Sequence, residues 1–133
     1  MKLIIHSDGG ARGNPGPAGI GACLHDEAGN LQAEVSLFLG IATNNQAEYK
    51  ALLAGLEKAL ELKAEEVECY LDSELVVKQI NHEYKVKNKE LAPLFLQVYN
   101  ISTKFKKTKF IHIPREQNKM ADQLANDAMD RGK

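Results

Sequence analysis

The chain has few cysteines and lacks a long apolar run. Its two cysteines, Cys23 and Cys69, each lie in an apolar, strand-like segment, and no CxxC spacing points to zinc. One possible pair cannot make a disulfide framework, so we interpret both as small buried hydrophobic side chains. The N-terminal apolar run reaches a charge at position 8, which is too short for a signal-peptide core or a membrane span. We therefore expect a cytoplasmic protein without a membrane partner.

The chain also lacks a surplus of positive charge. Its formal net charge is −1, which by itself argues against a nucleic-acid binder. The distribution is uneven, however, because residues 82–119 contain nine Lys or Arg against three acidic residues, and the remainder therefore carries −7. A basic segment beside an acidic pocket suits a polyanion held next to a metal site. A solvated lysine face explains the charge pattern equally well.

The hydrophobic pattern predicts one domain of the α/β class over residues 1–133. The 133 residues are 44% hydrophobic and 26% charged, with no repeat, linker or low-complexity segment. The order βββαβααβα predicts a five-stranded mixed sheet with helices on both faces. The expected strands cover about 2–8, 18–25, 31–39, 66–72 and 108–113, and the expected helices cover about 43–62, 73–81, 89–102 and 118 onward.

Four acidic residues occur where predicted strands end or predicted helices begin. Asp8 and Asp72 each close a strand, and neighbouring parallel strands would place them about 4.8 Å apart. Glu48 follows a capping-box sequence and shares the inward side of its helix with Leu52, so its charge needs a partner. Asp122 lies beside the apolar stripe of the last helix and is able to reach over the same sheet edge.

Together these acids predict a metal site. Any one of these acids alone is more commonly a helix cap or a surface charge. Four acids that all occur at strand ends or helix starts are rarely explained in this way. All-oxygen coordination favours Mg²⁺ or Mn²⁺ over zinc. Two such ions can hold the attacking water and the leaving oxygen of a phosphodiester. The predicted ligands are Asp8, Glu48, Asp72 and Asp122.

The segments around these acids resemble type 1 ribonuclease H. They are Asp8-Gly9-Gly10 followed by RGNPGPAG over 12–19, TNNQAE over 43–48, Asp72-Ser73, and NKMADQLA over 118–125. Each motif is weak alone, but the set covers nearly the whole chain in the order and spacing of the family. The resemblance implies a ribonuclease H-like fold. It also implies endonucleolytic hydrolysis of the RNA strand of RNA–DNA hybrids, which leaves 3′-hydroxyl and 5′-phosphate ends.

The resemblance further implies roles for individual residues. The four acids would bind two Mg²⁺ or Mn²⁺ ions, and Glu48 would also accept a hydrogen bond from a ribose 2′-hydroxyl. Asn14, Asn44 and Asn45 would touch the minor groove of the hybrid, and Thr43 would lie near a phosphate of the DNA strand. Arg12 and Gly13 of the glycine-rich turn would belong to the same nucleic-acid contact.

The chain departs from the family in two places. The loop before the last helix reads IPREQN over 113–118 and has no histidine, whereas many relatives carry one there. We expect Arg115 to take its place as a permanent positive charge that cannot shuttle a proton, with His112 as the less favoured alternative. The stretch 82–89 is too short for the basic protrusion of some relatives, and we expect a short form without a hybrid-binding domain before Asp8.

Two other functions remain open at this point. The first is a non-catalytic module that binds hybrids or double-stranded RNA, although a pure binder gains nothing from four negative charges against phosphate. The second is another nuclease of the same superfold, such as an integrase or junction resolvase, because fold alone does not decide function. In each case the expected partner is a nucleic-acid duplex and the chain is expected to be a monomer.

Overall fold

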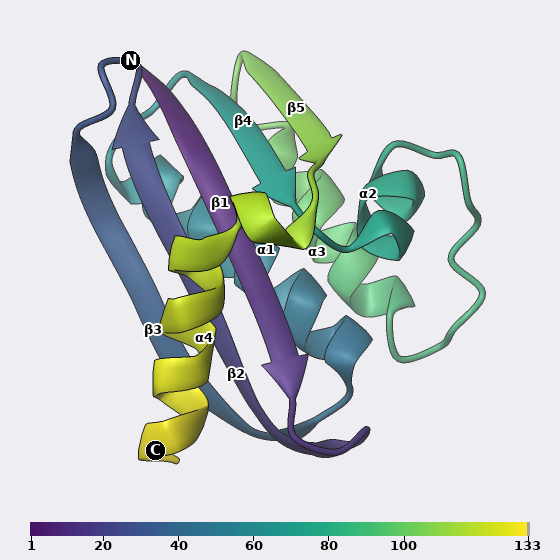
Figure 1. Ribbon diagram of the computed structural model, residues 1–133. Helices are drawn as coiled ribbons and strands as arrows, with labels where there is room; N and C mark the ends of the chain where they lie inside the picture. The colour runs from purple at the N-terminus through teal and green to yellow at the C-terminus, as the bar shows by residue number, and fades with distance from the viewer. Residues whose placement is uncertain (133) are drawn as a thin grey trace.

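The computed structural model describes residues 1–132 and contains one five-stranded mixed sheet (Figure 1). The strand order across the sheet is β3-β2-β1-β4-β5, with β1, β2 and β3 antiparallel and with β4 and β5 parallel to β1. The strands are β1 Lys2–Ala11, β2 Gly16–Asp26, β3 Leu31–Ala42, β4 Glu66–Leu71 and β5 Lys107–His112. The mixed sheet predicted from the sequence is confirmed.

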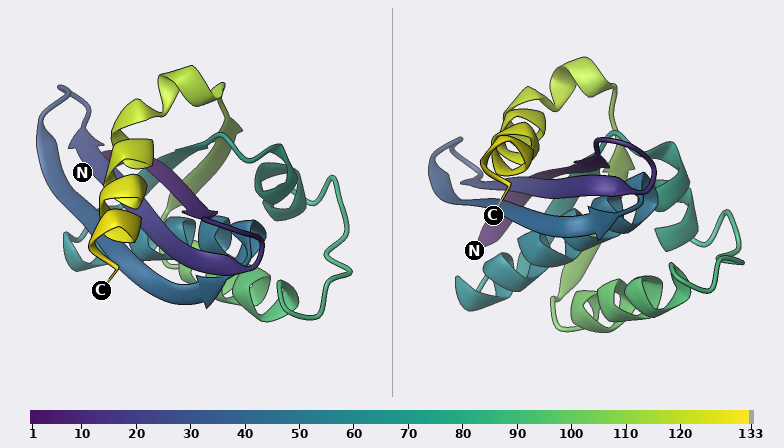
Figure 2. Two further views of the ribbon diagram at one scale, coloured as in Figure 1. Left: turned by 60° about the horizontal axis from the view of Figure 1, so that its bottom comes forward. Right: turned by 90° about the horizontal axis from the view of Figure 1, so that it is seen from below.

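Helices cover both faces of this sheet, as predicted (Figure 2). Helix α1, with α3 packed against it, lies on one face, and α4 crosses the other face over β2. The helices are α1 Asn44–Glu61, α2 Glu74–Ile80, α3 Ala92–Ser102 and α4 Lys119–Arg131, with a 3-10 turn at Arg115–Gln117. No helix of the described part of the chain is long and apolar enough to cross a membrane.

Helix α3 begins three residues later than the sequence predicted. Pro93 occupies the first turn of the helix, as expected, because its missing N–H is not needed there. The residues before it form a turn in which the Asn88 side chain accepts hydrogen bonds from the N–H groups of Glu90 and Leu91. This local competition from an asparagine side chain delays the helix.

The start of α1 is determined locally. Thr43 accepts a hydrogen bond from the Gln46 N–H at 3.1 Å, and the Gln46 side chain accepts one from the Thr43 N–H at 2.9 Å. This is the capping box that the sequence predicted. Behind it, Leu52 and Leu56 are fully buried against the sheet in the main core. The helix therefore has a defined first turn and a defined inward side.

Two glycines allow the helices to approach the sheet at the point where the acids gather. A Cβ on Gly9 of β1 would lie 2.2 Å from the Ala47 carbonyl oxygen of α1. A Cβ on Gly21 of β2 would lie 2.3 Å from the Ala121 carbonyl oxygen of α4. Since no other residue fits at these distances, the glycines set how closely α1 and α4 lie to the central strands.

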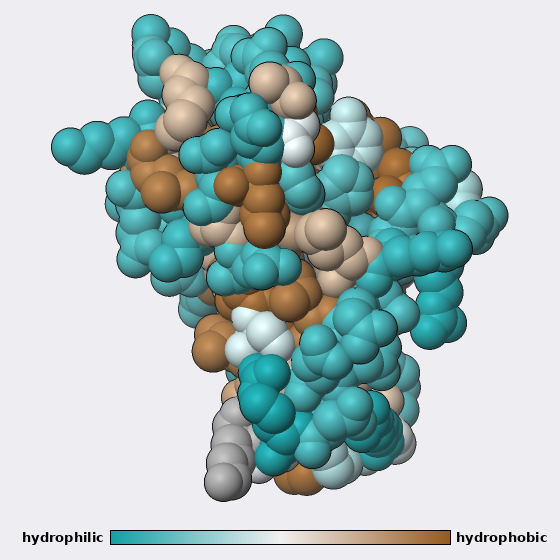
Figure 3. Space-filling model, turned by 60° about the vertical axis from the view of Figure 1, so that its left-hand side comes forward, coloured by the Kyte–Doolittle hydropathy of each residue, from teal (hydrophilic) through white to brown (hydrophobic). Residues whose placement is uncertain are grey.

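The outer edge of β3 exposes large apolar side chains, namely Leu31, Leu37 and Ile41. Figure 3 brings this side of the molecule forward and shows apolar atoms in separate patches among hydrophilic ones. Arg131, at the end of α4, donates a hydrogen bond to the Ser36 carbonyl at 2.7 Å and so covers part of this edge.

Replacing Gly9 by alanine is expected to destabilise the protein by about 1–3 kcal/mol, because the added methyl group would overlap the backbone of α1 at Ala47 and Glu48. Gly10→Ala is the matched control, since its Cβ would meet nothing closer than the Asn44 Oδ1 at 3.9 Å. Denaturant unfolding of both variants tests this. Equal stability of the two variants would contradict the close-approach argument.

Candidate active site

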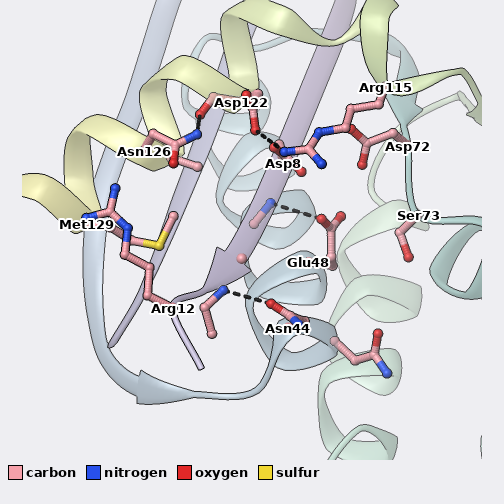
Figure 4. Close-up of a pocket in the computed structure, with 15 residues that line it drawn as sticks. Asp8, Arg12, Asn44, Glu48, Asp72, Ser73, Arg115, Asp122, Asn126 and Met129 are labelled. Carbon is pink, nitrogen blue, oxygen red and sulfur yellow. Dashed lines mark hydrogen bonds and ion pairs between the residues drawn. The ribbon is translucent and has the colours of Figure 1, made fainter. Parts of the chain in front are cut away.

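The parallel pairing of β1 and β4 brings Asp8 and Asp72 together. Ser7 pairs with Leu71 in the register of the two strands, so Asp8 and Asp72 are the next residues on adjacent strands. β1 is the central strand of the sheet, and Asp8 is 8% exposed, while Asp72 at the end of β4 is half-buried. Figure 4 shows both side chains directed into one cavity. The sheet edge predicted from the sequence is the one observed.

Helix α1 supplies the third carboxylate. Glu48 is 7% exposed, and its Oε1 accepts a hydrogen bond from the Gly9 N–H at 3.2 Å. Carboxylate oxygens of Asp8, Glu48 and Asp72 all lie within 4.8 Å of one another. The close approach at Gly9 is therefore what places Glu48 beside Asp8.

The burial of these carboxylates makes their charges unfavourable. Burial, reinforced by the nearby charges of Asp72 and Asp122, raises the pKa of Asp8 to about 7. Burial also raises the pKa of Glu48 well above its ordinary value, and the charge of Asp8 is the second cause of this increase. The Oε2 atom of Glu48 is buried and has no hydrogen-bond partner within residues 1–132. An unpaired carboxylate oxygen beside two more carboxylates fits a divalent cation bound by oxygen ligands.

Asp122 and Arg115 lie at the rim of the same cavity. Asp122 is in the first turn of α4, outside the three carboxylates that lie within 4.8 Å of one another. Its Oδ1 is 3.7 Å from Arg115 Nη2, and the Arg115 side chain is 79% exposed. The structure thus brings the predicted fourth acid to the cavity. His112, on β5, does not line it.

Two of the three amide residues predicted to bind nucleic acid, Asn44 and Asn45, form the cavity wall beside the acids. Asn44 Oδ1 accepts a hydrogen bond from the Ala11 N–H at 2.8 Å, and Asn14 Oδ1 accepts one from the Asn44 N–H at 3.0 Å. Asn45 lines the cavity, whereas Asn14 lies beyond it on the turn between β1 and β2. Both bonds tie this turn to the start of α1.

Arg12, Gly13 and Thr43 occupy different positions around this wall. Arg12 lines the cavity, but its guanidinium forms an ion pair with Asp130 of α4 at 2.6 Å. Gly13 has a φ of +99°, which the tight turn requires and which glycine adopts readily. Thr43 and Gly13 do not line the cavity, and the Thr43 oxygen is engaged as the helix cap.

The resulting cavity has a volume of about 510 Å³ and a predominantly polar lining. It runs from the acids past residues 9–12, at and just after the end of β1, and along one side of α4. Its lining residues are Asp8, Gly9, Gly10, Ala11, Arg12, Asn44, Asn45, Glu48, Asp72, Ser73, Arg115, Asp122, Ala125, Asn126 and Met129.

The sequence reasoning missed several residues of the site. Ser73 caps α2 and lines the cavity next to Asp72, and Asn126 and Met129 extend the cavity wall along α4. Their spacing from Asp122, at i+4 and i+7, is a signal that could have identified both. Asn118 lies behind the cavity and contacts Asp72, although the sequence motif assigned it no role.

Comparisons with known proteins agree with this fold. Residues 6–128 match a family described as reverse transcriptase-like. The chain is 45% identical over 131 residues to the bifunctional protein Rv2228c of Mycobacterium tuberculosis, which covers 98% of this chain and 36% of that protein. The chain therefore spans about a third of the length of that relative. It is also 41% identical to ribonuclease HI of Halobacterium salinarum, over 97% of this chain and 65% of that protein.

Solved structures give the same result. The N-terminal RNase H domain of Rv2228c superposes with a TM-score of 0.95 at 44% identity, covering 98% of this chain and all of that chain. LC11-RNase H1, isolated from compost and solved in complex with an RNA/DNA hybrid, superposes with a TM-score of 0.91 at 46% identity, covering 97% of each chain. The fold is the ribonuclease H fold. The chain belongs to the ribonuclease H family.

The raised pKa values predict how stability depends on pH in the absence of a divalent metal. Because Asp8 titrates at about 7 in the folded protein and near 3.8 ordinarily, the folded state binds more protons between these values. The free energy of unfolding should therefore fall as pH rises from about 4 to about 7. At pH 8, with a chelator present to remove divalent metal, the free energy of unfolding of Asp8→Asn should exceed that of the wild type by about 1–3 kcal/mol.

This difference should shrink at pH 4.5, where the Asp8 carboxyl of the wild type is protonated. Denaturant unfolding of both proteins at the two pH values measures it. A stability difference that does not depend on pH would show that the carboxylate charge is not the cause.

Proposed function

We propose that this domain is a metal-dependent endoribonuclease that hydrolyses the RNA strand of RNA–DNA hybrids. The observation that carries the proposal is the cluster of Asp8, Glu48 and Asp72 at one end of a polar cavity. The structural relative bound to an RNA/DNA hybrid supports this choice of substrate. The products would carry 3′-hydroxyl and 5′-phosphate ends.

Asp8, Glu48 and Asp72 would hold the metal, and Asp122 would complete the site from the rim of the cavity. Bound Mg²⁺ or Mn²⁺, as a pair of ions, would activate a water and stabilise the leaving oxygen of the phosphodiester. The unpartnered Oε2 of Glu48 supports its place among the ligands. The hydrogen bond from the Gly9 N–H to the other oxygen of Glu48 orients this side chain.

The amide wall supports recognition of the minor groove and the sugars. The oxygens of Asn14 and Asn44 each accept a backbone N–H, so the orientation of both amides is set. Their NH₂ groups donate no hydrogen bond within the described residues, and both residues are exposed. Minor-groove base edges present acceptors, and a ribose 2′-hydroxyl accepts as well as donates. Asn45 would act with them, and Glu48 would accept from the 2′-hydroxyl at the cleavage point.

The cations around the cavity would contact phosphates. Arg115 is largely exposed at the rim, where its permanent charge would stabilise the departing phosphate. Arg12 would contact a phosphate once the ion pair with Asp130 exchanges, because both of these side chains are exposed. Gly13 would belong to the nucleic-acid contact made by the turn, and Thr43 would lie near a phosphate of the DNA strand.

A non-catalytic hybrid-binding module is the second candidate. It is disfavoured because carboxylates pointing into the cavity would repel a phosphate backbone in the absence of metal. Another nuclease of the same superfold would differ from this proposal in its substrate. The amide NH₂ groups of Asn14 and Asn44 favour a duplex that carries ribose.

Replacing Asp8 or Asp72 by asparagine should abolish cleavage while the domain stays folded. Changes outside the ligand shell commonly cost 10–100-fold, so the loss of a direct ligand should reduce kcat by more than about 100-fold. Asp127→Asn is the control, because Asp127 lies on α4 and accepts a hydrogen bond from Gln123 away from the cavity. The assay uses labelled RNA–DNA, RNA–RNA and DNA–DNA duplexes with Mg²⁺ or Mn²⁺.

Cleavage of the RNA–DNA duplex by the wild type and by Asp127→Asn, but not by the other two variants, is expected. Undiminished cleavage by Asp8→Asn or Asp72→Asn would remove the metal-ligand assignment. Hybrid binding without cleavage in either metal would favour the binding module.

Arg115→Ala should lower kcat by about 10–100-fold and change hybrid affinity much less, because the lost charge acts mainly on the developing negative charge. Arg115→Lys is the matched variant and should recover part of kcat. Steady-state kinetics and a separate hybrid-binding measurement in Ca²⁺ separate the two effects. An unchanged kcat for Arg115→Ala would show that the side chain merely occupies the loop.

A further inference from the structure

Asn118 is a buried polar residue at the junction between the last helix and the sheet. It is 1% exposed and lies directly before α4. Its Nδ2 donates to the Ser7 carbonyl oxygen at 2.9 Å and to Asp72 Oδ2 at 3.4 Å. One NH₂ group therefore connects the ends of the two parallel strands that carry Asp8 and Asp72.

The backbone of Asn118 reaches the other two members of the site. Its N–H donates to the Arg115 carbonyl oxygen at 2.9 Å, and its carbonyl oxygen accepts from the Asp122 N–H at 3.1 Å. A single residue thus contacts Asp72 directly, the residue before Asp8, the first turn that holds Asp122, and the loop that holds Arg115.

We propose that Asn118 is a positioning residue for the metal site. It holds the Asp72 carboxylate and the start of α4 in the arrangement that binds the cation. This proposal rests on the proposed function. It adds a residue behind the cavity that touches neither the substrate nor the metal. Through Nδ2, Asn118 engages Asp72 Oδ2 and leaves the other carboxylate oxygen of Asp72 available to a metal.

A purely structural role as a helix cap does not explain this geometry. Asparagine is favoured before a helix because its side-chain oxygen accepts a backbone N–H. Asn118 makes no such side-chain cap, and its Oδ1 is buried without a hydrogen-bond partner in the described structure. The side chain is turned instead so that its NH₂ group meets Asp72 and Ser7. An unsatisfied buried oxygen lowers stability, so this orientation is not the one that a capping role would select.

Losing an outer-shell hydrogen bond to a metal ligand commonly weakens metal binding by about 10–100-fold. We expect Asn118→Ala to shift the Mg²⁺ concentration required for binding by that factor. Asn118→Leu is the second variant, because its branched side chain keeps the shape of asparagine and lacks the donor. It should show the same shift with a smaller loss of packing.

Gln79→Ala is the matched control. Gln79 is also a buried amide, at 5% exposed, and it accepts a hydrogen bond from the Tyr49 hydroxyl away from the cavity. Its loss should lower the melting temperature and leave Mg²⁺ binding unchanged. A general loss of stability is thereby separated from a change at the metal site.

The experiment measures the melting temperature of the wild type and the three variants over a range of Mg²⁺ concentrations, without substrate. The Mg²⁺ dependence of hybrid cleavage is measured in parallel. A 10–100-fold higher Mg²⁺ requirement in both Asn118 variants, with none in Gln79→Ala, is expected. A wild-type Mg²⁺ requirement in either folded Asn118 variant would overturn the proposal.

The two readouts separate this proposal from the proposed function. If the wild type binds Mg²⁺ but does not cleave hybrids, the proposed function fails, and the melting curves still decide the role of Asn118. If the wild type cleaves and the Asn118 variants keep its Mg²⁺ dependence, only the positioning role fails.

Discussion

The mutual repulsion of buried carboxylates is the interaction on which the rest of the site depends. Oxygens of Asp8, Glu48 and Asp72 lie within 4.8 Å of one another, and Asp8 and Glu48 are almost completely buried. Burial and like charge both oppose ionisation, which is why the pKa values of Asp8 and Glu48 are raised. A fold keeps such a cluster only where other contacts hold the backbone against it, and a bound divalent cation would reverse the sign of the interaction.

Those other contacts come from the sheet and from two close helix approaches. The β1–β4 pairing holds Asp8 and Asp72 in adjacent positions, and Gly9 allows α1 to bring Glu48 over the same strand end. On the opposite face, Gly21 allows α4 to approach β2. Asp8, Glu48 and Asp72 therefore lie where β1, α1 and β4 converge. Each of these three elements is anchored by apolar packing away from the charges. Burial of apolar surface elsewhere offsets the electrostatic cost.

The hydrogen bonds around the cavity divide it into two chemically different walls. The amides of Asn14 and Asn44 accept backbone N–H groups and present their NH₂ groups outward. Among the acids, Glu48 has a buried Oε2 without a hydrogen-bond partner in the described residues. The Arg12–Asp130 ion pair connects the segment after β1 to α4.

Much of the fold and the centre of the site could be predicted from the sequence because they depend on local patterns. The alternating Val67, Cys69 and Leu71 define a strand, the Thr43–Gln46 pair defines a helix start, and the inward side of α1 places Glu48 near the core. The parallel neighbours β1 and β4 then bring Asp8 and Asp72 together. What the sequence could not decide are contacts between residues far apart in the chain. The place of Asp122 at the rim, the pairing of Arg12 with Asp130, and the two hydrogen bonds of Asn118 depend on how α4 crosses the sheet. Hydrophobic periodicity determines which side of a helix faces inward, but the crossing is decided by the backbone approach at Gly21 and by the packing of the whole sheet.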